Sequence, residues 1–325
     1  SVFERDVKRP SGRTTRRRSF SMPSVTVGSV IEYQWKEYYN GRWSNNLHLD
    51  VQQDEPVWEL QLQVKPIDFS KTRFSGDLLM NTRNFQCQPP DWKRVGPDWY
   101  GISLQDVPAF HEEQYMPPID QLRSWIFFYY EERNAPEGKK YWQRFGKKKF
   151  DETKARTKSG DLVSKRATEI VAGAATPEEK VARLVNYCRT KVKNIVHPLF
   201  KVSAADLGEW KPILKPSETL ERGMGTPNDV QYLLIALAQA AGFDARLARL
   251  VGRDEYFFEE QFPNDYFMKH ANVAIKVDSE WKFFDVAQPF LEPGMLSWQE
   301  EGVPALIPDS KEPIYVNTPI SPPAR

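Results

Sequence analysis

The sequence is poor in cysteine, in surplus charge and in long apolar runs. Only two cysteines, Cys87 and Cys188, occur in 325 residues, too few and too far apart for a disulfide framework or a cysteine-rich zinc site. The 45 Lys and Arg residues are balanced by 44 Asp and Glu residues, so the chain lacks the basic surplus of a nucleic-acid-binding protein. Unbroken apolar runs reach only about six residues, against the roughly 20 of a membrane-spanning helix. We therefore expect no nucleic-acid partner and no transmembrane segment.

Histidine is also scarce, with four residues at His48, His111, His197 and His270. They are scattered along the chain without the spacing of a metal site, and we expect neither a metal nor another cofactor. Hydrophobic residues make up 40% of the chain and charged residues 27%, a composition typical of a globular protein and too apolar for a disordered one. The length predicts about two domains.

Residues 1–150 have the pattern of a β-rich domain. Apolar and polar residues alternate with period two in Val30–Lys36 and in Trp58–Val64, as in strands that bury one face. Turn signals such as Asn40-Gly41 and Pro117-Pro118 separate such segments. We predict an antiparallel, β-sandwich-like domain.

Helical signals dominate after about residue 150. Thr176 as N-cap, Pro177 at the first helical position and an acidic first turn predict the start of a helix. A second apolar helix is expected from about Pro227 to residue 241, closed by Gly242. Strands are expected at 243–250, 271–277 and 281–286. These elements predict an α+β core over residues 151–290.

Two further segments stand out by composition. Residues 291–325 are rich in proline and are expected to form an irregular C-terminal tail. Basic residues cluster in the first 18 residues and in 139–158. Because the whole chain is balanced in charge, we interpret the two clusters as a solvated hairpin rim and an interdomain linker; a patch for an anionic surface is the alternative.

The residues that bear chemistry follow a recurring order in the second half. The loop 223–229, Gly-Met-Gly-Thr-Pro-Asn-Asp, opens the second helix, His270 leads one strand, and Asp285 ends the next. This order resembles the transglutaminase-like, papain-like cysteine-peptidase core, from the helix at 177–192 to residue 286. In that family a nucleophilic Cys starts the helix, a His is its base and an Asp orients the His. The resemblance implies that His270 and Asp285 are the hydrogen-bonded remnant of a Cys-His-Asp triad.

That layout has a physical logic. The positive end of a helix dipole lowers the pKa of a thiol placed there and favours the reactive thiolate. An imidazole pairs with the thiolate, and a carboxylate fixes the tautomer of the imidazole.

This sequence departs from the family at the nucleophile. The family loop reads Gly-x-Gly-x-Cys-x-Asp, and Pro227 occupies the Cys position. Proline offers neither a nucleophile nor an N–H donor, although it suits the first turn of a helix. Thr226 is expected to cap the helix and Asp229 to complement its dipole. Together with Asn228, these two residues are candidate binding residues in the remnant cleft.

No other residue is a convincing substitute nucleophile. Cys188 lies on the apolar face of the first helix and reads as a small buried hydrophobe. Cys87 lies in a loop of the other domain, and Thr226 stands one residue too early. The sequence therefore predicts a core that has lost its nucleophile.

The N-terminal half carries a resemblance of its own. Segments 20–33 and 107–118 resemble the bacterial domain of unknown function that commonly precedes such cores. Proteins of this architecture are usually exported, so the resemblance implies a periplasmic, cell-surface or secreted location. No signal peptide is visible at the first residues of the sequence.

Three functions remain open. The leading hypothesis is a catalytically inactive transglutaminase-like protein that binds a protein, peptide or glycan in the remnant cleft. The second is an active hydrolase or acyltransferase, such as an amidase, peptidase or transamidase, with a non-standard nucleophile. The third is a structural module of an exported assembly.

Overall fold

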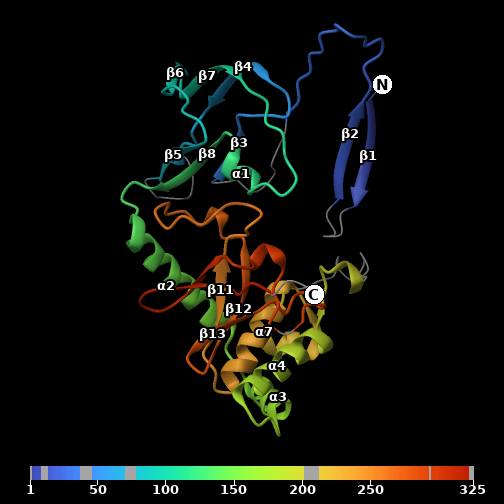
Figure 1. The fold of residues 1–325 in the computed structure, drawn as a ribbon, viewed down its shortest axis with the longest axis vertical. Coiled ribbons are helices and arrows are strands. Elements are labelled where there is room, and N and C mark those ends of the chain that lie inside the picture. The colour runs from blue at the N-terminus through green and yellow to red at the C-terminus, as the bar shows by residue number, and fades with distance from the viewer. Residues whose placement is uncertain are drawn as a thin grey trace.

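The computed structural model describes residues 2–8, 14–36, 46–69, 78–200, 212–292 and 294–321. The fold is α+β, with a β-rich N-terminal region and a mixed core of helices packed on a sheet (Figure 1). This arrangement confirms the predicted fold class. In the part of the chain that is described, no helix is both long and apolar enough to cross a membrane.

The β-rich region contains two three-stranded antiparallel sheets and a separate hairpin. One sheet has the order β3-β8-β5 and the other β4-β7-β6, and among the described strands β1 pairs with β2. The strands are β1 (Val2–Lys8), β2 (Thr14–Phe20), β3 (Asn46–Asp50), β4 (Val57–Val64), β5 (Leu78–Phe85), β6 (Lys93–Gly96), β7 (Trp99–Val107) and β8 (Trp125–Glu132), and α1 (Ile119–Leu122) precedes β8.

Strand β8 is buried on both faces, which explains its unbroken apolar sequence. Ile126 and Phe128 pack with residues of β4 and β7 in the core between the two sheets. Trp125 and Phe127 project from the opposite face into an aromatic cluster with residues of the C-terminal core. The sheet β3-β8-β5 is therefore the middle layer between the β-rich region and the core.

One predicted strand of this region is absent. Val30–Lys36 is described but forms no strand, and alternate residues do not become buried: Val30 is 96% exposed and Trp35 67%. The prediction was wrong because alternation marks a strand only where one face can be covered. Trp58–Val64 does form the predicted strand, as β4. The turn expected at Asn40-Gly41 lies outside the described residues.

The C-terminal core is a five-stranded antiparallel sheet with the order β13-β12-β11-β14-β15. Its strands are β11 (Ala245–Leu250), β12 (His270–Val277), β13 (Glu280–Phe284), β14 (Pro304–Ile307) and β15 (Ile314–Asn317). The helices are α2 (Gly138–Arg156), α3 (Asp161–Val171), α4 (Pro177–Lys191), α6 (Pro216–Arg222) and α7 (Pro227–Ala240). Short elements complete it: β9 (Lys193–Asn194), β10 (Met224–Gly225) and the 3-10 turns η2 (Pro198–Phe200), η3 (Asp265–Phe267) and η4 (Trp298–Glu300).

Helix α7 is the central helix of this core. Its apolar residues pack with α3, α4 and one face of the sheet, including Val273 and Ile275 of β12. A helix that is apolar on most sides must be covered on most sides, and α7 contacts α3, α4, α6, β11 and β12. The start of α7, which carries the site loop, is therefore held on a rigid element.

The last part of the chain corrects a second prediction. Residues 304–307 and 314–317, expected to be irregular, form β14 and β15 and extend the sheet beyond β11. Among the described prolines of this segment, Pro304 starts β14, Pro308 and Pro313 lie in the loop between β14 and β15, and Pro319 follows β15, all positions that a sheet tolerates. The predicted linker at 139–158 is also ordered, since most of it forms α2. The boundaries near residues 150 and 290 stay predictions.

An aromatic cluster joins the β-rich region to the core. Residues of the β11–β12 connection, among them Tyr256, Phe262 and Phe267, pack against Trp125 and Phe127. In Figure 1 this connection, drawn in orange, lies directly under β8 and β5. Because the connection leads into His270, the β-rich region holds the segment that carries a predicted site residue.

Candidate functional site

The start of α7 is a capping box built around Pro227. Thr226 is the N-cap: its Oγ1 accepts from the backbone N–H of Asp229 at 3.3 Å, and Asp229 Oδ2 accepts from the backbone N–H of Thr226 at 2.9 Å. The Thr226 hydroxyl also donates to Asp229 Oδ2 at 2.6 Å. Pro227 occupies the first helical position, which lacks an intrahelical partner for its N–H in any case. The predicted helix start is confirmed.

The three candidate binding residues differ in accessibility. Thr226 and Asp229 are bonded to each other, and Asp229 is buried. Asn228 is exposed. Of the three, only the Asn228 side chain faces solvent without a role in the cap, so any ligand contact from this loop would come first from Asn228.

Neither cysteine has the surroundings of a nucleophile. Cys188 is fully buried in the core around α7, and burial raises the pKa of its thiol to about 12. Cys87 is half-buried in the β-rich region, and its thiol lies 3.6 Å from the carbonyl oxygen of Trp125, to which it donates. Burial raises the pKa of Cys87 as well. A raised pKa disfavours the thiolate, which is the reactive form.

Two side-chain hydrogen bonds and one strand pair hold the site elements together at one end of the core. The amide of Gln231, one turn into α7, donates to the carbonyl of Ala271 at 2.6 Å and fixes α7 against the start of β12. The Asn194 amide donates to the carbonyl of Ala287 at 2.9 Å, just after β13. The β9–β10 pair then joins residue 194 to Gly225, directly before the cap. The predicted layout of helix start, His strand and Asp strand is thus present.

The hydrogen-bond partner of His270 is not the predicted one. His270 Nδ1 lies 3.2 Å from Oε1 of Glu300, in the turn η4. Asn272, two residues along β12, donates through Nδ2 to Oε2 of the same carboxylate at 3.3 Å. The expected bond from His270 to Asp285 is therefore wrong for this structure, because Glu300, which the sequence pattern did not include, occupies that position beside the imidazole.

Asp285 is held in a separate environment. Its Oδ1 accepts from the backbone N–H of Ala287 at 3.0 Å, and Arg189 donates to its carbonyl oxygen at 3.2 Å. Burial, and then the nearby charge of Glu300, raise the pKa of Asp285 from 3.8 to about 6. Two carboxylates this close in a buried place disfavour each other's charge, so Asp285 is readily protonated.

Glycine at position 252 makes room for the imidazole. A Cβ added to Gly252 would lie 2.8 Å from Nε2 of His270 and 2.6 Å from Oδ1 of Asp254. Both distances are shorter than any real contact of a methyl carbon, so a side chain here must displace the ring or the carboxylate. The backbone just after β11 therefore lies directly against the imidazole of His270.

We expect Gly252→Ala to destabilise the protein by about 1–3 kcal/mol, the range for overpacking, measured as the shift of the urea midpoint. Gly96→Ala is the matched control, because an added Cβ there would meet nothing closer than 3.8 Å and stability should change by less than about 0.5 kcal/mol. Equal stability of the two variants would contradict the close approach of Gly252 to His270.

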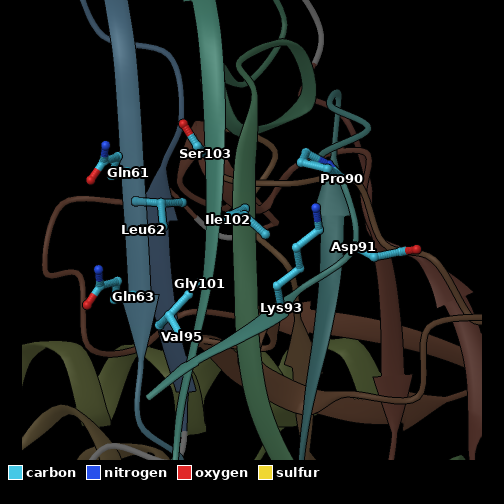
Figure 2. Close-up of a pocket in the computed structure, with 10 residues that line it drawn as sticks. All are labelled: Gln61, Leu62, Gln63, Pro90, Asp91, Lys93, Val95, Gly101, Ile102 and Ser103. Atoms are coloured by element: carbon cyan, nitrogen blue, oxygen red, sulfur yellow. The ribbon is translucent and has the colours of Figure 1, made fainter.

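The described residues also show what lies outside this site. They contain no group of three or more His, Cys, Asp or Glu side chains arranged to hold a metal. A cavity of about 330 Å³ lies in the β-rich region, between β4, β7 and the segment around β6. Figure 2 shows its lining side chains on these segments, and none of the predicted site residues is among them.

Sequence reasoning missed Glu300 entirely. The residue lies 30 positions after His270, in a segment expected to be irregular, and no local motif marks it. The available signal was indirect: an acidic residue in the apolar surroundings of Leu296 and Val303 is costly to bury without a partner. A buried carboxylate of this kind indicates an ion pair or a hydrogen-bonded partner nearby.

Comparison with known proteins agrees with this geometry. The family model of the transglutaminase-like superfamily matches residues 164–286, from α3 to the residue after Asp285. No curated protein sequence matches the chain.

Two crystal structures are similar to the chain at low sequence identity. A candidate protease from Parabacteroides distasonis has a TM-score of 0.51 at 14% identity, over 84% of this chain and 48% of its own. This chain thus spans about half the length of that protein. A candidate cysteine protease from Cytophaga hutchinsonii has a TM-score of 0.30 at 13% identity, over 75% of this chain and 74% of its own. The first likeness supports the fold, and with the family match it shows that the chain carries a transglutaminase-like core at residues 164–286, preceded by a β-rich N-terminal region.

Proposed function

We propose that this transglutaminase-like core is not a cysteine-dependent enzyme and acts as a module that binds a protein, peptide or glycan. The observation that carries the proposal is Pro227 at the first position of α7, inside an intact capping box. The helix start that would present a nucleophile is retained, while the nucleophile itself is gone. The two cysteines elsewhere in the chain do not replace it, since both have raised thiol pKa values.

The physical cost of this replacement is small, which explains how the fold tolerates it. Proline removes an N–H that has no helical partner at this position, and its fixed φ is suited to the first turn. The cap formed by Thr226 and Asp229 contributes about 1 kcal/mol in comparable helices. The loop therefore stays ordered without any catalytic role, as a binding surface requires.

Two polar side chains at the site, the exposed Asn228 and the partly exposed His270, favour recognition of a polar ligand. Asn228 is exposed beside the cap, and the His270 side chain is 27% exposed. Both can donate and accept hydrogen bonds, which suits the amides of a peptide or the hydroxyls of a glycan. By resemblance of its N-terminal region, we place the protein outside the cytoplasm, in the periplasm or at the cell surface.

The test is an assay of amidase, peptidase and transamidase turnover with the whole chain, before and after treatment with a thiol-blocking reagent. We expect no thiol-sensitive turnover. Thiol-sensitive turnover that disappears in His270→Ala would overturn the proposal. Turnover that resists the reagent but depends on Thr226 would instead support an active hydrolase with a non-standard nucleophile. Binding of a peptide or glycan, measured by calorimetry, should weaken in Asn228→Ala.

Restoring a thiol tests whether the layout still supports reactivity. In Pro227→Cys, built on Cys87→Ser so that the other thiol is the buried Cys188, we expect the new thiol to have a pKa below its ordinary value of about 8.5. The cause is the positive end of α7. The pKa is read from the pH dependence of the alkylation rate, with Pro227→Ala as the control for background labelling. An unshifted or raised thiol pKa would show that this loop no longer activates a nucleophile.

A further inference from the structure

A small group of buried polar side chains surrounds His270. It comprises Asn272 on the same strand and Glu300 in η4. Asp285, after β13, adjoins this group through Glu300, whose charge raises its pKa. Asn272, Asp285 and Glu300 are all at most 5% exposed. Buried polar groups persist only when they are bonded, so the pairing within this group decides the properties of His270.

The pairing singles out one carboxylate. Glu300 uses both of its oxygens on this group, Oε1 at 3.2 Å from His270 Nδ1 and Oε2 accepting from Asn272 Nδ2 at 3.3 Å. Asp285 instead accepts from the backbone N–H of Ala287. From this geometry we infer that Glu300 is the positioning residue of His270, in the role that the family pattern gives to Asp285.

The turn that carries Glu300 is itself fixed. The backbone N–H of Glu300 donates to the carbonyl of Ser297 at 2.8 Å, and its carbonyl accepts from the buried hydroxyl of Thr318 at 2.6 Å. The carbonyl of Gln299 accepts from the N–H of Arg253 at 2.8 Å. Contacts to the residue after β15 on one side and to the loop after β11 on the other leave the turn little freedom, as a positioning residue requires.

The orientation of Asn272 supports the same assignment. Its Nδ2 faces Glu300, and its Oδ1 has no hydrogen-bond partner among the described residues. A flipped amide would place two oxygens against each other. The hydrogen bond from Asn272 Nδ2 to the Glu300 carboxylate therefore outweighs the cost of leaving Oδ1 of Asn272 without a partner.

This pairing sets the tautomer of the imidazole. With a carboxylate facing Nδ1, the proton of neutral His270 resides on Nδ1, and Nε2, which faces Gly252, carries the lone pair. Nε2 is therefore the atom that takes up or releases a proton. Glu300 thus determines which nitrogen of His270 is available to a ligand.

The carboxylates around the ring all raise the pKa of His270. The hydrogen bond to Glu300 raises the pKa of His270, burial opposes it, and the charges of Glu300, Glu255 and Asp254 raise it further. Lys269 pairs with Glu255 at 3.1 Å and offsets part of that charge. Asp285, whose own pKa is raised by burial and by Glu300, accepts a hydrogen bond from the backbone N–H of Ala287. Glu300 is therefore the carboxylate with the largest effect on the pKa of His270.

Histidine titration by NMR tests the assignment in the whole chain labelled with ¹⁵N-histidine. The resonance of His270 is the one lost in His270→Gln. In the wild type we expect its pKa to lie above 6.5 and the neutral ring to carry its proton on Nδ1. Glu300→Gln should lower the pKa of His270 by at least one unit, a tenfold change in proton affinity. Asp285→Asn should change it by less than half as much.

A larger effect of Asp285→Asn than of Glu300→Gln would overturn the assignment, as would a neutral ring protonated on Nε2 in the wild type. If Glu300→Gln does not fold, Glu300→Asp replaces it: the charge is kept but its reach is shortened, and the pKa of His270 should still fall by more than in Asp285→Asn. The result does not depend on turnover, so it stands or fails separately from the proposed binding function.

Discussion

Trp125→Ala is expected to lower the free energy of unfolding by about 3–5 kcal/mol, the range for truncating a buried aromatic residue. Trp125 is 0% exposed and is stacked between His48 and Phe85, with ring centroids 4.0 Å away on either side. Its indole N–H donates to the carbonyl of Asp120 at 2.9 Å, and the truncation leaves that acceptor unpaired. The loss therefore combines a cavity and a missing hydrogen bond.

The measurement is urea unfolding followed by circular dichroism. Trp58→Ala is the matched control, because Trp58 lies in the same region but is 80% exposed, and its stability should change by less than about 0.5 kcal/mol. Since Trp125 also contacts Phe267 of the β11–β12 connection, His270 should show broadened NMR signals in the Trp125 variant. A loss below about 1 kcal/mol would contradict the tight aromatic junction between the β-rich region and the core.

Asp285→Asn is expected to stabilise the protein at pH 8 by about 1–3 kcal/mol and to have almost no effect below pH 4. The pKa of Asp285 is raised from 3.8 to about 6 in the folded state, by burial first and then by Glu300. The folded state therefore binds the proton more tightly than the unfolded state. The carboxyl costs nothing at low pH, and it destabilises increasingly as the pH rises from about 4 to about 6.

The upper limit of this stabilisation comes from the difference between the pKa values of Asp285 in the unfolded and folded states, 3.8 and about 6, which corresponds to about 3 kcal/mol. Asparagine keeps one oxygen for the N–H of Ala287 but carries no charge, so the cost at high pH is removed. The measurement is the urea midpoint of both proteins from pH 4 to pH 8. His270 titrates in the wild type and in the variant, and its raised pKa adds stability to each that is lost as the pH rises through that pKa. The difference between the two stability curves therefore isolates the contribution of Asp285.

Asp309→Asn is the control with the opposite sign. Burial opposes the charge of Asp309, but the N–H of Lys311 and the guanidinium of Arg246 lower its pKa overall. This carboxylate therefore stabilises the protein at pH values above its unfolded pKa, and that stabilisation is lost as the pH falls. Asp309→Asn should accordingly destabilise the protein at pH 8. A destabilising effect of Asp285→Asn at pH 8 would show that its bonds as a carboxylate outweigh the cost of burial.

Local chemistry was enough to predict two helices of the core, α4 and α7. Thr176 caps α4, accepting from the N–H of Glu179 at 3.2 Å, and Thr226 caps α7, both as their sequences indicate. Pro177 and Pro227 fix the first turns in the same way. Capping depends on residues within one turn, which is why such starts can be derived without knowledge of the fold.

Strands were less predictable, because their formation depends on distant partners. Val30–Lys36 alternates as a strand should but forms none, whereas the residues of β14 form one by pairing with β11, more than 50 positions earlier in the chain. Proline content suggested an irregular tail, yet Pro304 starts β14, and Pro308 and Pro313 lie in the loop after it, where a sheet allows proline. The side-chain pattern of a segment shows which face it could bury as a strand. Whether that strand forms depends on partner strands supplied by the rest of the fold.

The absence of a thiol at position 227, where the family pattern places its nucleophile, was determined by the sequence alone. It follows from the identity of Pro227, because no fold can supply a thiol from proline. The partner of His270 was decided only by the tertiary structure. The carboxylate of Glu300 reaches the imidazole because η4 is held between the loop after β11 and the residue after β15, and contacts between segments 30 residues apart are not encoded in any local pattern.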